Sequence, residues 1–329
     1  MPRDRFDREI DYLRISLTDR CNLRCVYCMP LSKVPYAASE DVLAAIEIET
    51  VARAAADVGF RKLRFTGGEP TLRPDIVDIV ARCAAVAGIE DVAMTTNGIR
   101  LPELAQPLRD AGLRRVNIHV DTLDETRLPE IMRWGNAKDI RAGIDAALDA
   151  GFRPLKLNCV VTAGYNEEDV VDLARLTIEK DWHVRFIELM PLGGGECAEV
   201  SRDRFVPTAK TRARIEAELG TLEPLSKAHA ADESENHRLP GANGVVGFIS
   251  PVSAPYCGAC NRMRLTADGR FHLCLLHDDE LDVRAALRRG ADTGEIGAIL
   301  LRAVGAKPTG HGLEQGVEPL HRSMHHIGG

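Results

Sequence analysis

The sequence predicts an α/β fold with a parallel sheet, because a strand followed by a helix recurs six times between Asp11 and about Pro191. Apolar and polar residues alternate within the strand segments, and glycines stand where several helical segments end. These observations fit a doubly wound open sheet, and they equally fit a barrel, complete or partial. A chain of 329 residues has room for one large α/β domain, or for one domain with an appendage.

The strands and helices follow in chain order. Each helical stretch spaces its apolar residues for one buried face; Pro74 suits a first helical position, and Asn166 suits an N-cap before three acidic residues. The predicted strands are 12–18, 62–66, 92–97, 116–121, 155–161 and 184–190. The predicted helices are 41–58, 74 to about 88, 101–111, 139–150 and one that begins after Asn166.

The predicted strands have two different faces. In the first strand, Leu13 and Ile15 alternate with Arg14 and Ser16, and most of the other strands follow the same pattern. Parallel strands covered on both sides are normally apolar throughout, so we expect the polar face to line the concave side of a curled sheet. Because burying Arg and Lys side chains without a partner is costly, we interpret this lining as a ligand cavity. A charged sheet edge exposed to water is the alternative.

The strand–helix pattern stops after Pro191, where the three glycines 193–195 mark a break. We therefore divide the chain into a first region, 1–195, and a C-terminal region, 196–329. The second region is expected to hold a helix at 207–219, an irregular loop at 225–243, short antiparallel strands at 244–249, 262–266 and 269–272, and helices at 282–289 and 293–304.

Composition excludes several classes of protein. The net charge of −7 argues against a general nucleic-acid surface. No signal peptide is evident at the N-terminus, and no run approaches the roughly 20 apolar residues that a membrane span needs. Nine cysteines without a signal sequence indicate reduced thiols or metal ligands, and hence a cytoplasmic protein.

Three cysteines, Cys21, Cys25 and Cys28, follow the first strand with C-x3-C-x2-C spacing. Thiolates placed in this way can bind one iron–sulfur cluster, and three ligands leave one iron of a four-iron cluster open. The spacing resembles that of radical S-adenosylmethionine enzymes, in which the open iron chelates that cofactor. A zinc site would need a fourth ligand, which no nearby His or Cys supplies. A disulfide would leave one thiol over and suits a secreted chain better.

A second group consists of Cys257, Cys260 and, fourteen residues further on, Cys274. A turn just before Cys274 would bring it back beside the other two. Zinc is a stronger competitor here, because C-x2-C is a common half of a zinc site, and His272 or His277 could complete it. The spacing alone does not decide between zinc and a second iron–sulfur cluster.

The motifs together resemble those of one family over essentially the whole chain. They are Cys21/Cys25/Cys28, Gly67-Gly-Glu-Pro70, Thr95-Thr-Asn-Gly98, Arg185-Phe-Ile-Glu-Leu-Met-Pro191, Cys257 through Arg264 with Cys274, and the terminal Gly328-Gly329. The pattern is similar to that of molybdenum-cofactor biosynthesis protein A, the GTP 3′,8-cyclase family of the radical S-adenosylmethionine superfamily. The resemblance implies an incomplete (β/α)6 barrel closed by a smaller C-terminal α+β region. It also implies S-adenosyl-L-methionine and two 4Fe-4S clusters, and thereby favours iron over zinc at the second cysteine group.

The resemblance assigns roles to single residues. The implied cofactor contacts are Tyr27, Gly67, Gly68, His119 and Met190. The implied substrate contacts are Arg14, Arg64, Thr95, Lys156, Arg262, Met263 and Arg264. His119 stands where the family usually has Ser, and the two glycines would let backbone carbonyls approach the cofactor. The Gly-Gly tail is expected to enter the barrel near the arginines and to position the substrate or the radical.

The implied reaction cyclises GTP to 3′,8-cyclo-7,8-dihydro-GTP, the first step of molybdopterin biosynthesis. A 5′-deoxyadenosyl radical removes hydrogen from C3′, and that carbon then bonds to C8 of guanine. The implied partners are GTP, an external one-electron reductant and the next enzyme of the pathway, and a homodimer is compatible with this reading. A radical enzyme that modifies a peptide and carries an auxiliary cluster is the main alternative; the basic residues favour a phosphorylated substrate over it. A non-enzymatic electron carrier would leave Gly67-Gly-Glu-Pro70 unexplained.

Overall fold

The computed structural model describes residues 1–32, 34–193, 195–227, 229–317 and 319–328. The strands in these ranges form one sheet of twelve, in the order β12-β11-β10-β1-β2-β3-β4-β5-β6-β9-β8-β7. Its centre is the predicted parallel run, β1 (Tyr12–Ser16), β2 (Lys62–Thr66), β3 (Asp91–Thr96), β4 (Arg115–His119), β5 (Lys156–Val161) and β6 (His183–Glu188). The sheet is not closed, so the predicted incomplete barrel is confirmed.

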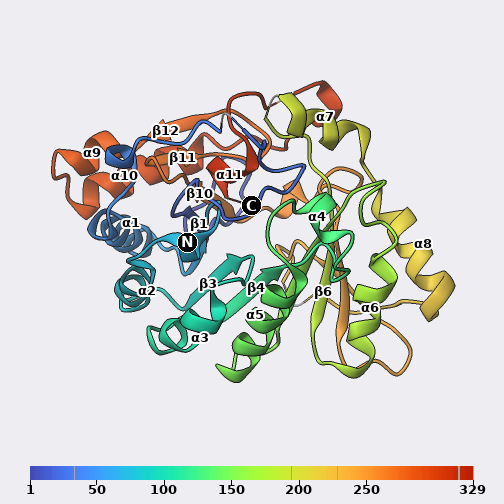
Figure 1. Ribbon diagram of the computed structural model, residues 1–329. Coiled ribbons are helices and arrows are strands. Elements are labelled where there is room, and N and C mark those ends of the chain that lie inside the picture. Colours follow the sequence, from blue (N-terminus) through green and yellow to red (C-terminus); the bar gives the residue numbers. More distant parts are fainter. Residues whose placement is uncertain (33, 194, 228, 318, 329) are drawn as a thin grey trace.

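Helices cover the outer face of this curved sheet, one after another in chain order (Figure 1). They are α1 (Ala45–Asp57), α2 (Ile76–Ala84), α3 (Leu101–Asp110), α5 (Ala137–Asp149) and α6 (Val170–Glu179), with the short α4 (Leu128–Ile131) before α5. The apolar strand residues, such as Leu13 and Phe65, are fully buried beneath them. No helix in the described ranges has both the length and the apolar character needed to cross a membrane.

The C-terminal strands extend the same sheet at both edges. At one edge β9 (Val245–Ile249) runs parallel to β6, followed by antiparallel β8 (Glu235–Arg238) and β7 (Glu223–Pro224). At the other edge β10 (Arg262–Leu265) runs parallel to β1, followed by antiparallel β11 (Arg270–His272) and β12 (Glu280–Asp282). Two of the expected antiparallel strands therefore pair in parallel with the barrel, because the open edges of β1 and β6 offer unpaired backbone groups.

The other C-terminal elements pack on the barrel. They are α7 (Gly195–Asp203), α8 (Thr208–Leu219), α9 (Arg284–Arg288), α10 (Thr293–Gly305) and α11 (Met324–Ile327). Helix α10 lies against α1, and α8 lies against α6. The expectation of an irregular loop at 225–243 was wrong for β8. This strand is too short and too polar to show an alternation of apolar and polar residues in the sequence. The division of the chain at residue 195 stays a prediction.

The strand register gathers basic side chains on the inner face. Arg14 on β1 pairs with Arg64 on β2 and with Arg264 on β10. All three side chains are more than nine-tenths buried. The polar face therefore lines an interior, as the ligand-cavity interpretation requires, and is not a water-exposed edge.

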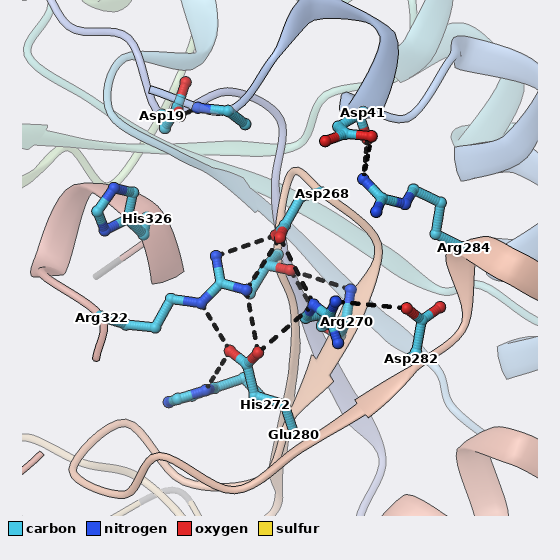
Figure 2. A network of polar contacts seen from close by, with 12 residues as sticks. Asp19, Asp41, Asp268, Arg270, His272, Glu280, Asp282, Arg284, Arg322 and His326 are labelled. Atoms are coloured by element: carbon cyan, nitrogen blue, oxygen red, sulfur yellow. Dashed lines mark hydrogen bonds and ion pairs between the residues drawn. The ribbon is translucent and has the colours of Figure 1, made fainter. Parts of the chain in front are cut away.

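An ion-pair network connects the last segment of the chain to the β10–β12 edge of the sheet (Figure 2). The Arg322 guanidinium donates to both carboxylate oxygens of Asp268 at 3.1 and 2.9 Å, and to both of Glu280 at 2.8 and 3.0 Å. Glu280 also lies 3.1 Å from Nδ1 of His272. This anchor leads into α11 and then Gly328, where an added Cβ would lie 2.0 Å from Thr66 Oγ1.

Gly328 is therefore packed against Thr66 at the end of β2, and Thr66 lines a cavity together with Arg14 and Arg262. The described part of the tail thus ends against β2, and the entry of the Gly-Gly tail into the barrel stays a prediction. Gly329 lies outside the described residues, and the proximity of the tail to the arginines stays a prediction.

We expect Arg322→Gln to loosen the tail. The substitution removes charged hydrogen bonds to two partly buried carboxylates, each worth about 1.5–3 kcal/mol. Hydrogen exchange measured by mass spectrometry should therefore become faster in residues 320–327. Arg289→Gln is the control, because Arg289 pairs with the single carboxylate of Glu295 at the surface. Unchanged exchange in the Arg322 variant would mean that other contacts hold the tail.

Candidate active site

The first cysteine group lies in the loop after β1, at the carboxyl end of the parallel strands. Cys21, Cys25 and Cys28 all line one cavity of about 210 Å³. Tight turns set their spacing: the N–H groups of Cys28 and Met29 both donate to the Cys25 carbonyl, at 2.9 and 3.1 Å. Arg24 braces the loop by donating to the Cys21 carbonyl at 2.7 Å.

The chemistry of this group suits a metal cluster. Burial raises the pKa of Cys21 to about 11, and it also raises the pKa values of Cys25 and Cys28 well above the ordinary value. Thiols in such a place ionise only when a cation takes the place of the proton, as iron does. Three sulfur atoms on one cavity wall therefore fit the predicted iron–sulfur cluster with one open iron.

The two glycines of Gly67-Gly-Glu-Pro70 allow two loops to cross. A Cβ on Gly67 would lie 2.5 Å from the Thr18 carbonyl oxygen, and one on Gly68 would lie 2.3 Å from that of Arg20. The backbone N–H of Gly68 donates to the Thr18 carbonyl, and that of Glu69 donates to the Arg20 carbonyl at 2.8 Å. The glycines thus hold the chain that leads directly into Cys21, a packing role that the sequence did not reveal.

Glu69 joins this motif to Thr95-Thr-Asn-Gly98. Its buried carboxylate accepts hydrogen bonds from Thr71, from the Thr96 hydroxyl at 2.7 Å and from the Asn97 N–H at 2.7 Å. Burial nevertheless raises the pKa of Glu69 above its ordinary value. The two motifs are therefore one structural unit at the ends of β2 and β3.

His119 forms a compact group with Tyr27 and Asp121. The Tyr27 hydroxyl donates to Asp121 at 2.6 Å, and His119 Nε2 lies 3.0 Å from that hydroxyl and 3.1 Å from the same carboxylate. Burial opposes protonation of His119, but Asp121 more than offsets it, so the pKa lies above its usual value. His119 and Asp121 also lie with Cys25 in a group whose ligand atoms are within 4.8 Å of one another. Because Tyr27 is hydrogen-bonded to both His119 and Asp121, we infer that these residues hold one another in place and do not bind a further metal.

A second cavity, of about 990 Å³, adjoins the first. The two share Arg64, Glu233 and Arg262 in their walls. The basic residues of the larger cavity come from strands across the barrel and include Lys156 and Arg185. Burial and Arg185 lower the pKa of Lys156 to about 8. Burial is the larger cause and the neighbouring arginines add to it; a polyanionic ligand would counteract the repulsion between the cations.

The second cysteine group lies beside β10. The turn Cys257–Ala259 precedes the strand, and the Cys257 carbonyl accepts hydrogen bonds from Cys260 N–H at 3.2 Å and from Arg8 at 2.8 Å. Burial opposes ionisation of Cys260, but Arg262 and Lys307 lower its pKa to about 6. Lys307 is itself buried and donates to the carbonyls of Arg262 and Leu273. Cys260 therefore favours thiolate, the form in which cysteine binds metals, whereas burial raises the pKa of Cys257.

The structure brings most of the predicted residues together. All the predicted cofactor contacts, Tyr27, Gly67, Gly68, His119 and Met190, line the smaller cavity. Arg14, Arg64, Thr95, Arg262 and Arg264 line the smaller cavity too, and Lys156 lines the larger one. The Met263 side chain instead packs in the apolar core, because it points to the opposite face of β10. A substrate contact from Met263 would have to come from its backbone.

Among the charged residues that sequence reasoning did not assign to the site, Arg185 and Glu233 lie in the basic cluster. Arg185 continues the alternating polar pattern of the strands on β6, so the period-2 pattern could have found it. Glu233 belongs to the segment expected to be an irregular loop, where no periodic signal exists.

Comparisons with known proteins agree with this site. The family model for the radical SAM superfamily matches residues 15–177, and the model for Molybdenum Cofactor Synthesis C matches residues 182–313. The solved structure of Streptococcus suis SuiB bound to the precursor peptide SuiA has a TM-score of 0.63 at 15% identity, covering 92% of this chain and 66% of that one. The fold and the first cysteine site thus define a radical SAM protein, a class that implies S-adenosylmethionine and a 4Fe-4S cluster.

The curated relatives narrow the class. The GTP 3′,8-cyclase of Moorella thermoacetica is 47% identical over 327 residues, which cover 99% of this chain and all of that protein. That of Pelotomaculum thermopropionicum is 46% identical with the same coverage. The chain belongs to the GTP 3′,8-cyclase family.

We expect Gly68→Ala to destabilise the protein by about 1–3 kcal/mol, because the added Cβ would overlap backbone that cannot move aside. Iron retention should fall as well, because the displaced chain leads into Cys21. Gly305→Ala in α10 is the matched control: nothing lies within 4 Å of its Cβ position. The control should be neutral or slightly stabilising. Thermal unfolding and iron analysis under anaerobic conditions measure both effects, and equal behaviour of the two variants would contradict the loop-crossing role.

Proposed function

We propose that the protein cyclises GTP to 3′,8-cyclo-7,8-dihydro-GTP, the first step of molybdenum cofactor biosynthesis. The observation that carries the proposal is the junction of two cavities. One is lined by three cysteines, and the other is lined by buried cations that suit a triphosphate, with Arg64 and Arg262 common to both. A nucleotide held by the cations would extend toward the cysteine cavity.

The residues of the first cavity have distinct tasks. Cys21, Cys25 and Cys28 would hold a four-iron cluster, and Tyr27 and Met190 would contact S-adenosylmethionine. Bound together, these two groups supply a one-electron cleavage that generates a carbon radical able to remove hydrogen from a sugar carbon. The protein's part is to position that carbon and to exclude water, and the buried surroundings of Tyr27 and Met29 support this role.

We assign a second four-iron cluster to Cys257, Cys260 and Cys274. Arg262 and Arg264 stand on β10, between Cys260 and Cys274 in the chain, and line the smaller cavity, so a ligand of the open iron would lie next to the basic residues. The purine of GTP is the proposed ligand. His272 and His277 were the candidate fourth ligands of a zinc site. Nδ1 of His272 faces Glu280, Nδ1 of His277 lies 3.4 Å from Asp279, and the Nε2 atoms of both are buried without a hydrogen-bond partner among the described residues. These contacts fit zinc as well as iron, so the second cluster rests on the family resemblance and on the metal content measured below.

The peptide-modifying alternative has less support. The likeness to SuiB is at 15% identity and concerns the fold alone. The buried cations of the larger cavity match phosphate oxygens better than a peptide backbone.

Electron balance requires an external one-electron reductant for the cluster. The cyclised product must also pass to the next enzyme of the pathway. Both partners are proposals, and so are a homodimer and a cytoplasmic location.

The proposed function predicts about eight iron atoms per chain after anaerobic reconstitution, because each cysteine triad suits a four-iron cluster. Joint replacement of Cys21, Cys25 and Cys28 by Ala should leave about four iron atoms and abolish cleavage of S-adenosylmethionine. The matched replacement of Cys257, Cys260 and Cys274 should also leave about four, keep the cleavage and abolish the cyclised product of GTP. One zinc beside four iron atoms in the native protein would overturn the second cluster.

GTP binding should weaken as the pH rises through about 8. The Lys156 ammonium has a pKa of about 8 in the free protein. Bound phosphate favours the charged form, so binding takes up a proton and affinity declines once the amine is neutral. Calorimetry should show about a tenfold loss between pH 7 and pH 9. Lys156→Arg keeps its charge and should flatten the profile; an equally steep profile in that variant would assign the pH dependence to another group.

A further inference from the structure

Glu233 occupies the centre of the arginine cluster. Its carboxylate accepts hydrogen bonds from Arg14 Nη2 at 3.0 and 2.7 Å, and it also pairs closely with Arg262. It is the acidic residue common to the walls of both cavities. A single carboxylate therefore sits where the two cavities meet.

The cations around this carboxylate outnumber it. Arg14, Arg64, Arg185, Arg262 and Arg264 are all more than nine-tenths buried. Among the described residues, the Nε atoms of Arg14, Arg64, Arg185 and Arg264 have no hydrogen-bond partner. Aromatic faces offset part of the charge, because Tyr12 lies under both Arg14 and Arg64 at 5.4 and 5.5 Å. With the oxygen and nitrogen of its side-chain amide exchanged, the orientation that satisfies both groups, Asn117 would add one oxygen 3.0 Å from Arg185 Nη2. The cluster thus has far more donors than Glu233 can satisfy, which is the property of a site for a ligand with several anionic oxygens.

Glu233 reaches this centre from outside the barrel strands. It lies between the turn at 229–232 and β8, and this segment forms one wall of the larger cavity. The arginines, in contrast, stand on β1, β2, β6 and β10 of the sheet and are held by its register. The loop backbone that carries Glu233 is therefore less constrained than the strand backbone that carries the arginines.

We propose that Glu233 is an internal competitor of the substrate: its carboxylate occupies the polyphosphate site and leaves that site when a nucleotide polyphosphate binds. The part that concerns GTP rests on the proposed function, whereas the anion site rests on the arginines alone. Glu233 then determines specificity, because each ligand that uses the arginines must first displace it. The apparent affinity is reduced by the fraction of protein in which Glu233 already stands aside. Ligands with several phosphates make enough contacts to overcome this loss, and uncharged nucleosides do not.

The test compares Glu233→Gln with native protein, both reconstituted anaerobically, by calorimetry with GTP and with inorganic tripolyphosphate. Removing the competing charge should tighten both ligands about tenfold or more. Glu235→Gln is the matched control, since Glu235 is an exposed acid two residues away whose side chain lies 3.9 Å from Lys227. It should change neither affinity. Unchanged or weaker binding of tripolyphosphate by Glu233→Gln overturns the proposal.

A second measurement uses the native protein and needs no substitution. Hydrogen exchange in residues 229–236 should become faster when tripolyphosphate binds, although bound ligand normally slows exchange. A structural or ligand-contacting Glu233 would leave this exchange unchanged or slower, and that result overturns the proposal. The outcomes separate the two claims: tighter tripolyphosphate binding without turnover of GTP keeps the competitor and removes the proposed function. Turnover of GTP, combined with no gain in tripolyphosphate affinity in Glu233→Gln, keeps the proposed function and removes the competitor.

Discussion

The cost of burying several guanidinium groups side by side governs this structure. Arg14, Arg64 and Arg264 share one row of the sheet, where each disfavours the charge of its neighbours. Burial and these neighbours lower the pKa values of Arg185 and Arg264 to about 10. A protein keeps such a cluster only if something compensates for it. Here the compensation is one carboxylate, aromatic faces and, in our proposal, the phosphates of the substrate.

The edges of the incomplete barrel explain how two distant cysteine groups serve one interior. An open parallel sheet leaves unpaired backbone at β1 and β6, and C-terminal strands pair with both. Because β10 pairs in register with β1, Arg262 and Arg264 join the inner row that the first region began. Cys257 and Cys260 precede the same strand, and residues beside the second triad line the two cavities: Tyr256 and Leu275 the smaller one, Gly258 and Ala259 the larger one. One backbone pairing thus positions both the proposed cluster and the basic residues.

The first cysteine site depends on close backbone approach. Its loop is tied to the turn after β2 by contacts that only glycine permits at positions 67 and 68. Glu69 then ties that turn to the end of β3. The tail reaches the same place, with Gly328 against Thr66. Motifs that are far apart in the sequence therefore form one packed unit around the proposed radical chemistry.

The sequence by itself determined the parallel α/β core, both cysteine triads and the basic residues Arg14, Arg64 and Lys156, because these features are local: a period of two, a spacing or a capping residue. Arg262 and Arg264 were assigned only through the family resemblance. Only the tertiary structure decided that β9 and β10 pair in parallel with the barrel, that the Met263 side chain faces the core and that Glu233 enters the arginine cluster. Each of these depends on contacts between residues that lie far apart in the chain, and such contacts leave no periodic trace. Unpaired backbone groups on β1 and β6 determine where β10 and β9 pair. The buried arginines determine where the carboxylate of Glu233 lies.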